Sequence, residues 1–483
     1  MMIPRLKNKA VYDRLSVVTQ DFARKGLDLS LSFNVPGLGE VCCKKVLRAI
    51  PDKRIACEGY VGATRVLVKI YFSKYNALRN WRRWKRSAYG YKAFHATHIP
   101  APAILFSGYL PQYAFYVLVL EYLEDGVSLD MAINSAFDGH LQDEVVTPLI
   151  PVIAAQHEAG ILQNDLHLGN FMVRGETIYS LDGDQVKYLG ASLSRQRSLE
   201  HLTRFLAKLP TALGSSFEPL INAYAQCRGW DFSQEEVMRL RQGVFSTRKK
   251  NLFSFLSKAL KSKDPFVRNS SRGFFSVYKR QADLNLQEII DAFRDASSGA
   301  IRAMMRYETV SFSGNDMVLW TSPAWGFLTM CPWWEATRVW RNALMLERLG
   351  LGSPCPVGLV ACRTGFLRWN CAVIFRQFEG ITLRDFLTSP STSNTQKERT
   401  AGLLADAFFL LSLVGVGFRR ISSEDILVSR DRVIFLGLEN INRNQLIKGP
   451  DTPPELLAFL DQWQDLPEIR NMLHCQIVKK CIG

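Results

Sequence analysis

The chain has 483 residues, of which 47% are hydrophobic and 22% are charged, an ordinary globular balance with room for two or three domains. No segment offers the roughly twenty uninterrupted apolar residues that a helix needs to cross a bilayer, so the sequence excludes a membrane-spanning helix. The formal net charge is +15, which favours an anionic partner such as a nucleic acid, acidic lipid headgroups or a phosphorylated substrate.

The first fifteen residues, MMIPRLKNKAVYDRL, carry charge but no apolar core of the kind found in a secretory signal. The longest apolar stretch, at 403–418, is too short to span a membrane and contains Asp406, so we expect a buried helix there. The ten cysteines form no CxxC pair and no Cys/His cluster at zinc spacing. They are typical of reduced, mostly buried thiols in a cytoplasmic protein.

The elements of the first half are predicted from periodicity. RIACEGYVGATRVLVKIYF at 54–72 indicates two strands joined by a turn that contains glycine. NALRNWRRWKRSAYGYKAF at 76–94 indicates a basic helix, which the prolines of HIPAPAILFSGY follow. A further strand is predicted at 114–123, and a region rich in helices should then extend to about residue 262.

A domain boundary is predicted near residue 280, because the preceding segment 263–281 is polar and contains Gly and Ser at its centre. The second half then repeats the order of the first with different chemistry. IPAPAILFSG is echoed by SPCPVGLVAC, GILQNDLHLGNFMV by GVGFRRISSEDILV, and TIYSLDGDQVKY by DRVIFLGLENIN. Two copies of one fold, at 1–280 and 281–483, are the simplest interpretation.

Chemistry concentrates in GILQNDLHLGNFMV, at 160–173. Asp165 is followed five residues later by Asn170 and, after a predicted strand, by Asp182. Phosphoryl transfer assisted by a metal requires a carboxylate that accepts the hydroxyl proton, and an amide and a second carboxylate that hold Mg²⁺ on the nucleotide phosphates. These three residues fit those roles in that order.

Two upstream residues extend the pattern. Lys69 lies on a predicted strand, where its ammonium can neutralise the α- and β-phosphates, and Glu121 lies where a strand passes into the nucleotide hinge. A lone Asp-x4-Asn would usually be a turn or a helix cap, but lysine, hinge, Asp, Asn and Asp in this order are far more specific. The chain therefore resembles the protein-kinase-like superfamily.

Within that superfamily, the residues before Asp165 are Gln163 and Asn164 and not His and Arg, and position 167 is His. NDLHLGNF is similar to the DLHxGN form of small-molecule and sugar kinases. Over roughly residues 40–280 the chain most resembles the bacterial lipopolysaccharide core heptose kinases, the Kdo/WaaP and InaA-like group. The resemblance implies ATP- and Mg²⁺-dependent phosphorylation of a heptose of the lipopolysaccharide inner core, at the cytoplasmic face of the inner membrane.

The implied fold is α+β, with two tandem protein-kinase-like domains that each combine a small β-rich N-lobe with a helical C-lobe. Some features depart from the pattern. No Glu occurs between Glu58 and Glu121, so the helix at 76–94 lacks the carboxylate that usually pairs with the strand lysine, and Ser87 stands near that place. The turn AIPDKRIACEG has no G-x-G-x-x-G pattern, so phosphates would rest on backbone amides near 52–54 and on Lys53 or Arg54.

Two further residues have open roles. His167 could orient Asp165 or contact the acceptor, or it could be a satisfied structural histidine. Asp184 could assist metal binding, although a solvated acid in a turn is the favoured interpretation.

The second copy lacks this chemistry. Trp320 lies close to the position of the strand lysine, Arg420 takes the place of the proton acceptor, Asp425 that of the Asn, and Gly437 that of the second metal acid. Without the lysine and both carboxylates, no route to phosphoryl transfer with Mg-ATP is left. We expect a degenerate, pseudokinase-like domain that covers the first domain or binds the acidic glycan or a partner enzyme. The alternative is an unrelated helical domain.

Basic residues are interleaved with aromatic ones in RNWRRWKR at 79–86, which places Trp81 and Trp84 on one face of the helix. Such a face suits an anionic lipid surface, but tryptophans packed on the sheet beneath solvated cations are the simpler interpretation. STRKKNLF at 246–253 is ambiguous in the same way. No recognition helix, zinc module or aromatic sheet motif indicates nucleic-acid binding.

We therefore predict a kinase whose partner is the lipopolysaccharide core glycolipid, with peripheral contact to the inner membrane surface and to other core-assembly enzymes. Two alternatives stay open. The first is a non-catalytic nucleotide-binding scaffold for those enzymes, which the missing helix glutamate suggests. The second is a kinase of the same architecture for another small molecule, such as an aminoglycoside or choline.

Overall fold

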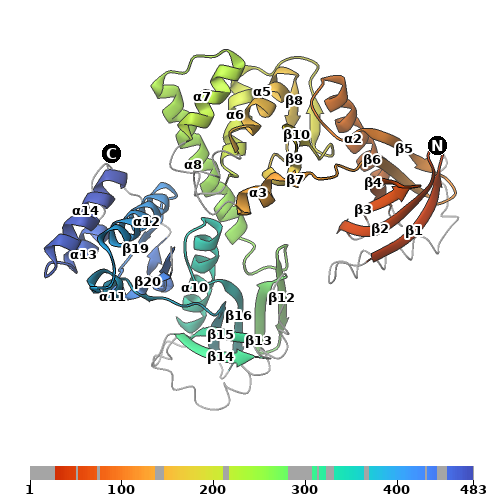
Figure 1. Cartoon of the computed structure of the whole chain (residues 1–483). Helices are drawn as coiled ribbons and strands as arrows, with labels where there is room; N and C mark the ends of the chain where they lie inside the picture. The colour runs from red at the N-terminus through yellow and green to blue at the C-terminus, as the bar shows by residue number, and fades with distance from the viewer. Residues whose placement is uncertain are drawn as a thin grey trace. The chain divides into compact units, whose positions relative to one another are not determined.

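The computed structural model describes residues 28–50, 53–72, 77–135, 146–209, 217–280, 307–312, 315–321, 331–363, 369–429, 432–442 and 454–481. The chain divides into two compact units, Met1–Val244 and Phe245–Gly483 (Figure 1). Of the sequence predictions, Asp52 lies outside the described residues. Among the described residues, no helix is long and apolar enough to cross a membrane.

The first unit begins with an antiparallel sheet of six strands in the order β1-β2-β3-β4-β6-β5. The strands are β1 (Asp28–Val35), β2 (Gly39–Ile50), β3 (Arg54–Val61), β4 (Thr64–Tyr71), β5 (Ile104–Leu110) and β6 (Phe115–Glu121). The predicted hairpin at 54–72 is confirmed as β3 and β4, and its turn contains Gly62 at φ +57°. The predicted strand at 114–123 is confirmed as β6.

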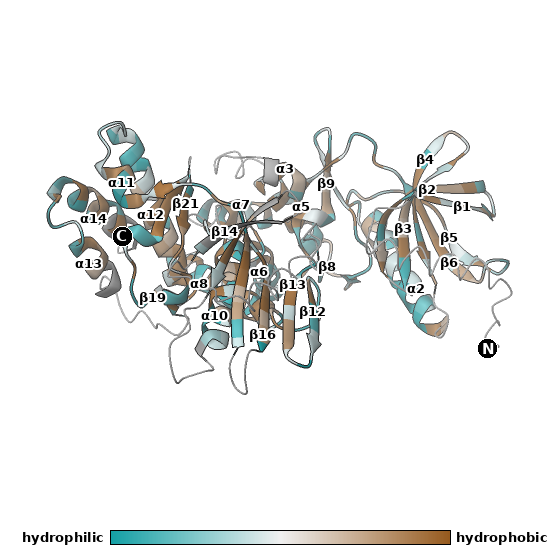
Figure 2. Cartoon of the chain, turned by 90° about the horizontal axis from the view of Figure 1, so that it is seen from below, coloured by the Kyte–Doolittle hydropathy of each residue, from teal (hydrophilic) through white to brown (hydrophobic). Residues whose placement is uncertain are grey.

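The predicted basic helix is confirmed as α2 (Ala77–Ala96). Its buried residues lie mainly in its second half and pack with the β4 and β6 side chains Tyr71, Leu118 and Leu120. The ring of Trp84 stacks on Tyr116, with ring centroids 5.0 Å apart. Figure 2 shows hydrophilic and hydrophobic residues side by side along this helix. Packing against the sheet therefore accounts for Trp84, because a ring held this way is not free to enter a lipid surface.

The rest of the first unit contains helices and short strands, so the region predicted to be rich in helices also holds three small β-pairings. In chain order the elements are β7 (Val127–Ser128), α3 (Leu129–Ser135), α5 (Leu149–Glu158), β8 (Ile161–Gln163), η1 (Leu168–Asn170), β9 (Phe171–Arg174), β10 (Thr177–Ser180), β11 (Val186–Tyr188), α6 (Arg195–Leu206), α7 (Glu218–Arg228) and α8 (Gln234–Leu256).

The second unit has its own sheet of six strands, in the order β12-β13-β16-β17-β15-β14, followed by helices and short strands. In chain order the elements are β12 (Phe266–Ser271), β13 (Phe274–Lys279), β14 (Tyr307–Phe312), β15 (Asn315–Thr321), α10 (Cys331–Arg348), β16 (Pro356–Arg363), β17 (Trp369–Arg376), β18 (Ile381–Thr382), α11 (Leu383–Thr388), α12 (Asn394–Leu413), β19 (Gly417–Phe418), η3 (Ser423–Asp425), β20 (Ile426–Ser429), β21 (Arg432–Phe435), η4 (Leu438–Asn440), β22 (Ile441–Asn442), α13 (Pro454–Asp461) and α14 (Pro467–Cys481).

The two units repeat one topology. The run β3-β4-α2-β5-β6-β7-α3-α5-β8-η1-β9-β10-β11 corresponds to β14-β15-α10-β16-β17-β18-α11-α12-β19-η3-β20-β21-β22, with η4 before β22 as an addition in the second unit. The registers agree as well: Gln163 pairs with Val186 across β8 and β11, and Phe418 pairs with Ile441 across β19 and β22, so both offsets are 255 residues (418 − 163 and 441 − 186). This constant offset shows that the described residues of the two units share these strand pairings.

The boundary between the units lies earlier than the predicted one near residue 280. The division falls between Val244 and Phe245, within α8. The hairpin β12-β13 precedes residue 280 but belongs to the second sheet, since β13 pairs with β16. The polar segment that suggested a linker therefore forms two strands. Most side chains of β13 are buried, while those of β12 are mostly exposed, which explains the polar composition.

Separate apolar cores support the two units. One core gathers the β1–β6 side chains, and the largest one joins the second sheet to α10, α12 and α14. The buried helix predicted at 403–418 corresponds to the second half of α12, whose residues Leu404, Phe408 and Leu411 are buried, but the helix ends at Leu413 and residues 417–418 form β19. Trp320 of β15 is also buried in this core, so the strand that corresponds to β4 carries an apolar residue where the first unit has Lys69.

Candidate active site

The loop between β8 and β9 positions Asp165 and Asn170. Its backbone turns through the short helix η1, and the Asn170 amide donates a hydrogen bond of 2.6 Å to the Asp165 carbonyl oxygen. The backbone N–H of Leu181, just before Asp182, donates to the Asn170 carbonyl oxygen at 2.9 Å. Asn170 is buried, whereas the side chain of Asp165 is 44% exposed. The loop is therefore fixed by its own amides while its carboxylate stays accessible to a ligand.

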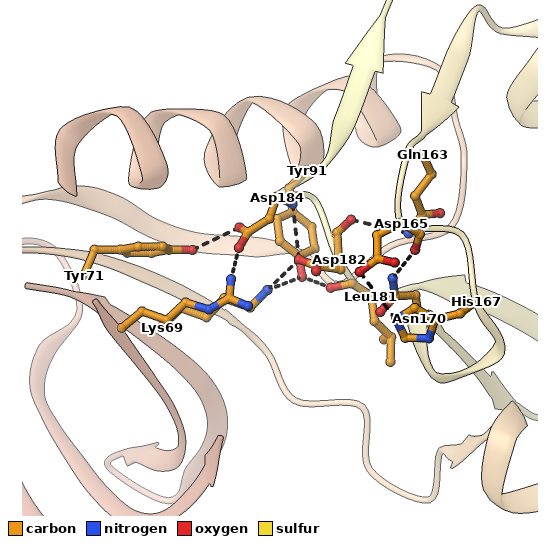
Figure 3. Close-up of polar contacts among 11 residues, drawn as sticks. Lys69, Tyr71, Tyr91, Gln163, Asp165, His167, Asn170, Leu181, Asp182 and Asp184 are labelled. Atoms are coloured by element: carbon orange, nitrogen blue, oxygen red, sulfur yellow. Dashed lines mark hydrogen bonds and ion pairs between the residues drawn. The ribbon is translucent and has the colours of Figure 1, made fainter. Parts of the chain in front are cut away.

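Lys69 and Asp182 meet in this unit. Lys69 is a buried residue of β4, and its Nζ lies 3.5 Å from Asp182 Oδ1 (Figure 3). Burial lowers the pKa of Lys69 to about 8, although the Asp182 carboxylate acts in the opposite direction. A lysine with a lowered pKa, paired with one carboxylate in a mostly buried place, is typical of functional sites.

Tyr91 stands where the sequence lacks the expected helix carboxylate. Ser87 of α2 is buried and offers no charge, but one turn later the Tyr91 hydroxyl accepts a hydrogen bond of 3.2 Å from Lys69 Nζ. The same hydroxyl donates to the Leu181 carbonyl oxygen. Tyr91 thus links the strand lysine to the segment that carries Asp182. Nothing in the local sequence singles out Tyr91, because a tyrosine on a buried helix face has the same pattern as a core residue.

The Asp184 carboxylate is engaged by two residues of the β-sheet. It forms an ion pair with Arg54 of β3, and it accepts a hydrogen bond of 3.3 Å from the Tyr71 hydroxyl. Asp184 also donates its backbone N–H to Asp182 Oδ1 at 3.2 Å. The favoured interpretation of Asp184 as a solvated turn acid is wrong, because the carboxylate is mostly buried between these partners. Arg54 is committed to Asp184 and is not free to bind phosphates in this arrangement.

Two basic side chains approach Asp165 from the outside. Lys208 Nζ lies 3.3 Å from Asp165 Oδ1, and His167 Nε2 lies 3.7 Å from Asp165 Oδ2. The position of His167 favours the interpretation in which it orients Asp165. Lys208 follows α6, more than forty residues along the chain, so no local pattern could have assigned it to this loop.

Glu121 and Lys53, the other predicted nucleotide contacts, form no hydrogen bond or ion pair with the described residues Lys69, Asp165, Asn170 or Asp182. Glu121 lies at the end of β6, where its carboxylate pairs with Arg174 at 3.1 Å and accepts the Ala103 backbone N–H at 3.3 Å. The Glu121 side chain therefore fixes this segment. Lys53 precedes β3 with an exposed side chain that has no partner among the described residues.

A buried chain of hydrogen bonds supports the loop from below. The Tyr224 hydroxyl lies 2.6 Å from His157 Nδ1, His157 Nε2 lies 2.7 Å from His201 Nδ1, and His201 Nε2 lies 2.9 Å from the Gln163 carbonyl oxygen. Since the carbonyl can only accept, His201 donates to it, His157 donates to His201, and Tyr224 donates to His157. Two neutral imidazoles satisfy the whole chain. Gln163 is thereby held two residues before Asp165.

The donor set fits a magnesium nucleotide. Among the described residues, no group of three or more His, Cys, Asp or Glu forms a metal cluster. However, Mg²⁺ in nucleotide sites is held by one or two protein oxygens together with phosphates and water. The Asn170 side-chain amide and the Asp182 carboxylate both offer oxygen atoms to a metal. The backbone hydrogen bond from Leu181 N–H to the Asn170 carbonyl oxygen holds the two segments together. These residues are the ones that would hold the ion.

The second unit keeps the framework without the reactive groups. Leu436 donates its N–H to the Asp425 carbonyl oxygen at 2.8 Å, as Leu181 does to Asn170, and both offsets are 255 (436 − 181 and 425 − 170). The same offset takes Asp165 to Arg420 and Asp182 to Gly437. The Asp425 carboxylate accepts the Ser422 backbone N–H at 3.3 Å and so serves as a local cap. The predicted correspondence of these positions is confirmed.

A β-rich lobe with a buried strand lysine, followed by helices and an Asp-x4-Asn loop, defines an α+β protein of the protein-kinase-like fold, and the predicted fold class is confirmed. No protein-family model matches the chain, and no curated protein is significantly similar in sequence.

Solved structures match parts of this chain at low similarity. "WaaP in complex with acyl carrier protein" is 13% identical, with a TM-score of 0.33, and the match covers 43% of this chain and 86% of that one. Vaccinia related kinase 3 is 13% identical, with a TM-score of 0.30, covering 50% and 96% of the two chains. A protein from Ralstonia eutropha described as an aminoglycoside phosphotransferase is 9% identical, with a TM-score of 0.32, covering 52% and 92%.

Proposed function

We propose that the first unit is an ATP- and Mg²⁺-dependent kinase that phosphorylates a hydroxyl group of a small molecule. The observation that carries this proposal is the contact between Lys69 and Asp182, 3.5 Å apart, beside the loop that holds Asp165 and Asn170. Such a set supplies a phosphate-binding cation, two metal ligands and an accessible carboxylate, which phosphoryl transfer requires.

Each residue has one task in this proposal. Asp165 accepts the proton of the acceptor hydroxyl, since its carboxylate is the exposed one. Asn170 and Asp182 hold Mg²⁺, and Lys69 neutralises charge on the α- and β-phosphates. When bound, the magnesium nucleotide supplies the phosphoryl group and neutralises charge that develops on it. Glu121 marks the hinge beside the adenine, and Lys53 is an exposed cation at the entrance of the phosphate site.

The acceptor we propose is a heptose of the lipopolysaccharide inner core. The support is the NDLHLGNF sequence, which resembles that of the core heptose kinases, and the formal net charge of +15, which suits an anionic glycolipid. This acceptor would place the protein in the cytoplasm, in peripheral contact with the inner membrane surface and near other core-assembly enzymes. The second unit acts as a pseudokinase in this proposal.

The experiment is a phosphate analysis of the lipopolysaccharide core from cells that lack the protein, complemented with wild type, Asp165→Ala or Arg420→Ala. Arg420 is the matched control because it occupies the same position in the second unit. Loss of one heptose phosphate that wild type and Arg420→Ala restore, and Asp165→Ala does not, is the expected result. Full restoration by Asp165→Ala would refute the catalytic role of the first unit.

A non-catalytic scaffold is the second candidate. Its support is α2, from which the Tyr91 hydroxyl and no carboxylate contacts Lys69. A thermal shift with Mg-ATP, together with a turnover assay on core glycolipid, separates the two functions: the scaffold binds nucleotide without turnover. Turnover on an aminoglycoside or choline, but not on core glycolipid, would instead change the acceptor and keep the kinase.

A further inference from the structure

The second unit contains a pocket of about 230 Å³ whose lining includes Arg419, the neighbour of Arg420, but neither Arg420 nor Gly437. One wall is formed by α10, and the other by the residue after β19 and by β22. The residues that line it are Trp334, Thr337, Arg338, Arg341, Arg419, Ile441 and Asn442. Three of these seven are arginines and none is acidic, so the lining is strongly cationic.

The three arginines have no carboxylate partner among the described residues. Arg338 Nη1 donates a hydrogen bond of 3.4 Å to the Glu439 carbonyl oxygen. The Nε of Arg341 is buried and has no hydrogen-bond partner in the described part of the chain. A buried donor without a partner is costly, and it is satisfied most simply by an acceptor that enters the pocket. Guanidinium groups pair preferentially with phosphate and carboxylate oxygens.

Arg419 has no cationic counterpart in the first unit. Arg419 corresponds to Asn164 at the same offset of 255 (419 − 164). Asn164 uses its side-chain amide for a local bond of 3.1 Å to the Gln185 carbonyl oxygen. The second copy has therefore lost the groups for phosphoryl transfer but has an arginine where the first has a small structural amide.

The rim of the pocket carries an aromatic ring. Trp334 is 64% exposed, an unusually large exposure for a tryptophan. Indole presents a flat apolar face, on which the C–H face of a sugar ring can pack. The pocket is also smaller than the roughly 300–1,000 Å³ typical of sites for drug-sized ligands, so a single small ring with its substituent is the size class that fits.

We propose that this pocket binds a phosphate monoester carried on a sugar, with Arg338, Arg341 and Arg419 on the phosphate and Trp334 on the ring. This inference goes beyond the proposed kinase and does not depend on it, because the pocket contains none of the predicted catalytic residues. Phosphate is favoured over a carboxylate because three guanidinium groups can share its oxygens. The degenerate unit would thereby recognise phosphorylated glycans.

The test is calorimetric titration of the full chain with glucose 6-phosphate, glucose and inorganic phosphate. We expect glucose 6-phosphate to bind and glucose not to bind. Arg419→Ala should weaken glucose 6-phosphate at least about tenfold, the usual scale for loss of one charge-assisted contact. Trp334→Ala should weaken glucose 6-phosphate but leave inorganic phosphate unchanged.

Two controls locate the binding. Arg432 is an exposed arginine of β21 outside the pocket, so Arg432→Ala should bind like wild type. Lys69→Ala should also leave this binding unchanged, which separates it from any phosphate bound by the first unit. Arg419→Gln, with circular dichroism of every variant, provides a second reading if Arg419→Ala fails to fold.

Three outcomes would overturn the proposal. Absence of glucose 6-phosphate binding at millimolar concentration would reject the pocket as a site. Unchanged affinity in folded Arg419→Ala and Arg419→Gln would place any binding elsewhere. Equal affinities for inorganic phosphate and glucose 6-phosphate would reject the sugar as part of the ligand.

Discussion

Lys69 Nζ lies 3.5 Å from Asp182 Oδ1, and both groups are largely withdrawn from solvent, with side chains 9% and 18% exposed. A helix carboxylate is the expected partner of this lysine, but the structure gives it the Asp182 carboxylate and the Tyr91 hydroxyl. The lysine therefore has one acidic neighbour on the segment that we propose binds metal. Binding of a magnesium nucleotide would draw Asp182 to the ion and the lysine to the phosphates.

Lys69→Met should lower kcat/KM for phosphoryl transfer by at least about 100-fold, because removal of one charge-stabilising group commonly costs that much. The measurement is steady-state turnover with the acceptor identified by the core analysis. Lys45→Met is the matched control, since Lys45 is an exposed lysine of β2, which β3 separates from β4 in the same sheet. Wild-type turnover in Lys69→Met would remove this lysine from the proposed mechanism.

The same substitution should raise stability. Burial lowers the pKa of Lys69 from 10.5 to about 8, so the unfolded state binds more protons than the folded state between those values, and wild-type stability gains from a rise in pH across that window. Below pH 8 the free-energy cost of keeping Lys69 charged in the folded state is fully present, and it amounts to at most about 3 kcal/mol. Urea unfolding should show Lys69→Met more stable than wild type at pH 7, with a difference that shrinks towards pH 10. An equal difference at both pH values would contradict this assignment.

Local sequence patterns predicted much of the first unit and its alignment with the second unit. Lys69 on an alternating strand, and Asp165 and Asn170 in one loop, were readable because their spacing is short and regular. The hydrogen bonds that place Leu181 on Asn170 and Leu436 on Asp425 confirm the alignment of the two copies.

The parts that sequence reasoning missed depend on long-range packing. Tyr91 meets Lys69 because the helix packs on the sheet, and Lys208 reaches Asp165 from the segment that follows α6. Neither contact follows from spacing. The hairpin before residue 280 reads as a polar linker, since nothing local shows that β13 adds to the far edge of the second sheet.

Gly90→Ala should destabilise the first unit by about 1 to 3 kcal/mol, the range for overpacking a tight site. A Cβ at this position of α2 would lie 2.1 Å from the Gly183 carbonyl oxygen, and a backbone atom of the Asp182 segment cannot yield as a flexible side chain can. The measurement is urea unfolding, with turnover alongside. Gly402→Ala is the matched control on helix α12, because its Cβ meets nothing within 4 Å and alanine favours a helix. Equal effects of the two substitutions would refute the close approach of α2.

Lys208→Ala should lower kcat about tenfold with little change in the KM for ATP, because its ammonium lies 3.3 Å from Asp165 Oδ1 and is positioned to act on the acceptor side. Lys208→Arg should recover part of the loss, since the charge is kept. Lys187→Ala, an exposed lysine of β11, serves as the control. An increase in the KM for ATP without a change in kcat would instead assign Lys208 to nucleotide binding.

His157→Gln should weaken the acid sensitivity of the fold. Burial is the main reason that the pKa of His157 falls to about 2, and His201 adds to the effect. Below pH 6.5 the unfolded chain takes up a proton on this residue while the folded chain does not, so wild-type stability falls as pH falls, by about 1.4 kcal/mol per pH unit. Glutamine removes that proton uptake but also breaks the chain from Tyr224 to Gln163, so the variant should be less stable than wild type at pH 7.

The informative quantity is therefore the slope of the unfolding free energy between pH 6.5 and 5, measured in urea, and not the stability at one pH. The slope should be shallower in His157→Gln than in wild type. His474→Gln should keep the wild-type slope, because it leaves the buried histidine pair intact. Should the slopes of His157→Gln and wild type coincide, the pair would not be held neutral. Its role in supporting the Asp165 loop would then rest on packing alone.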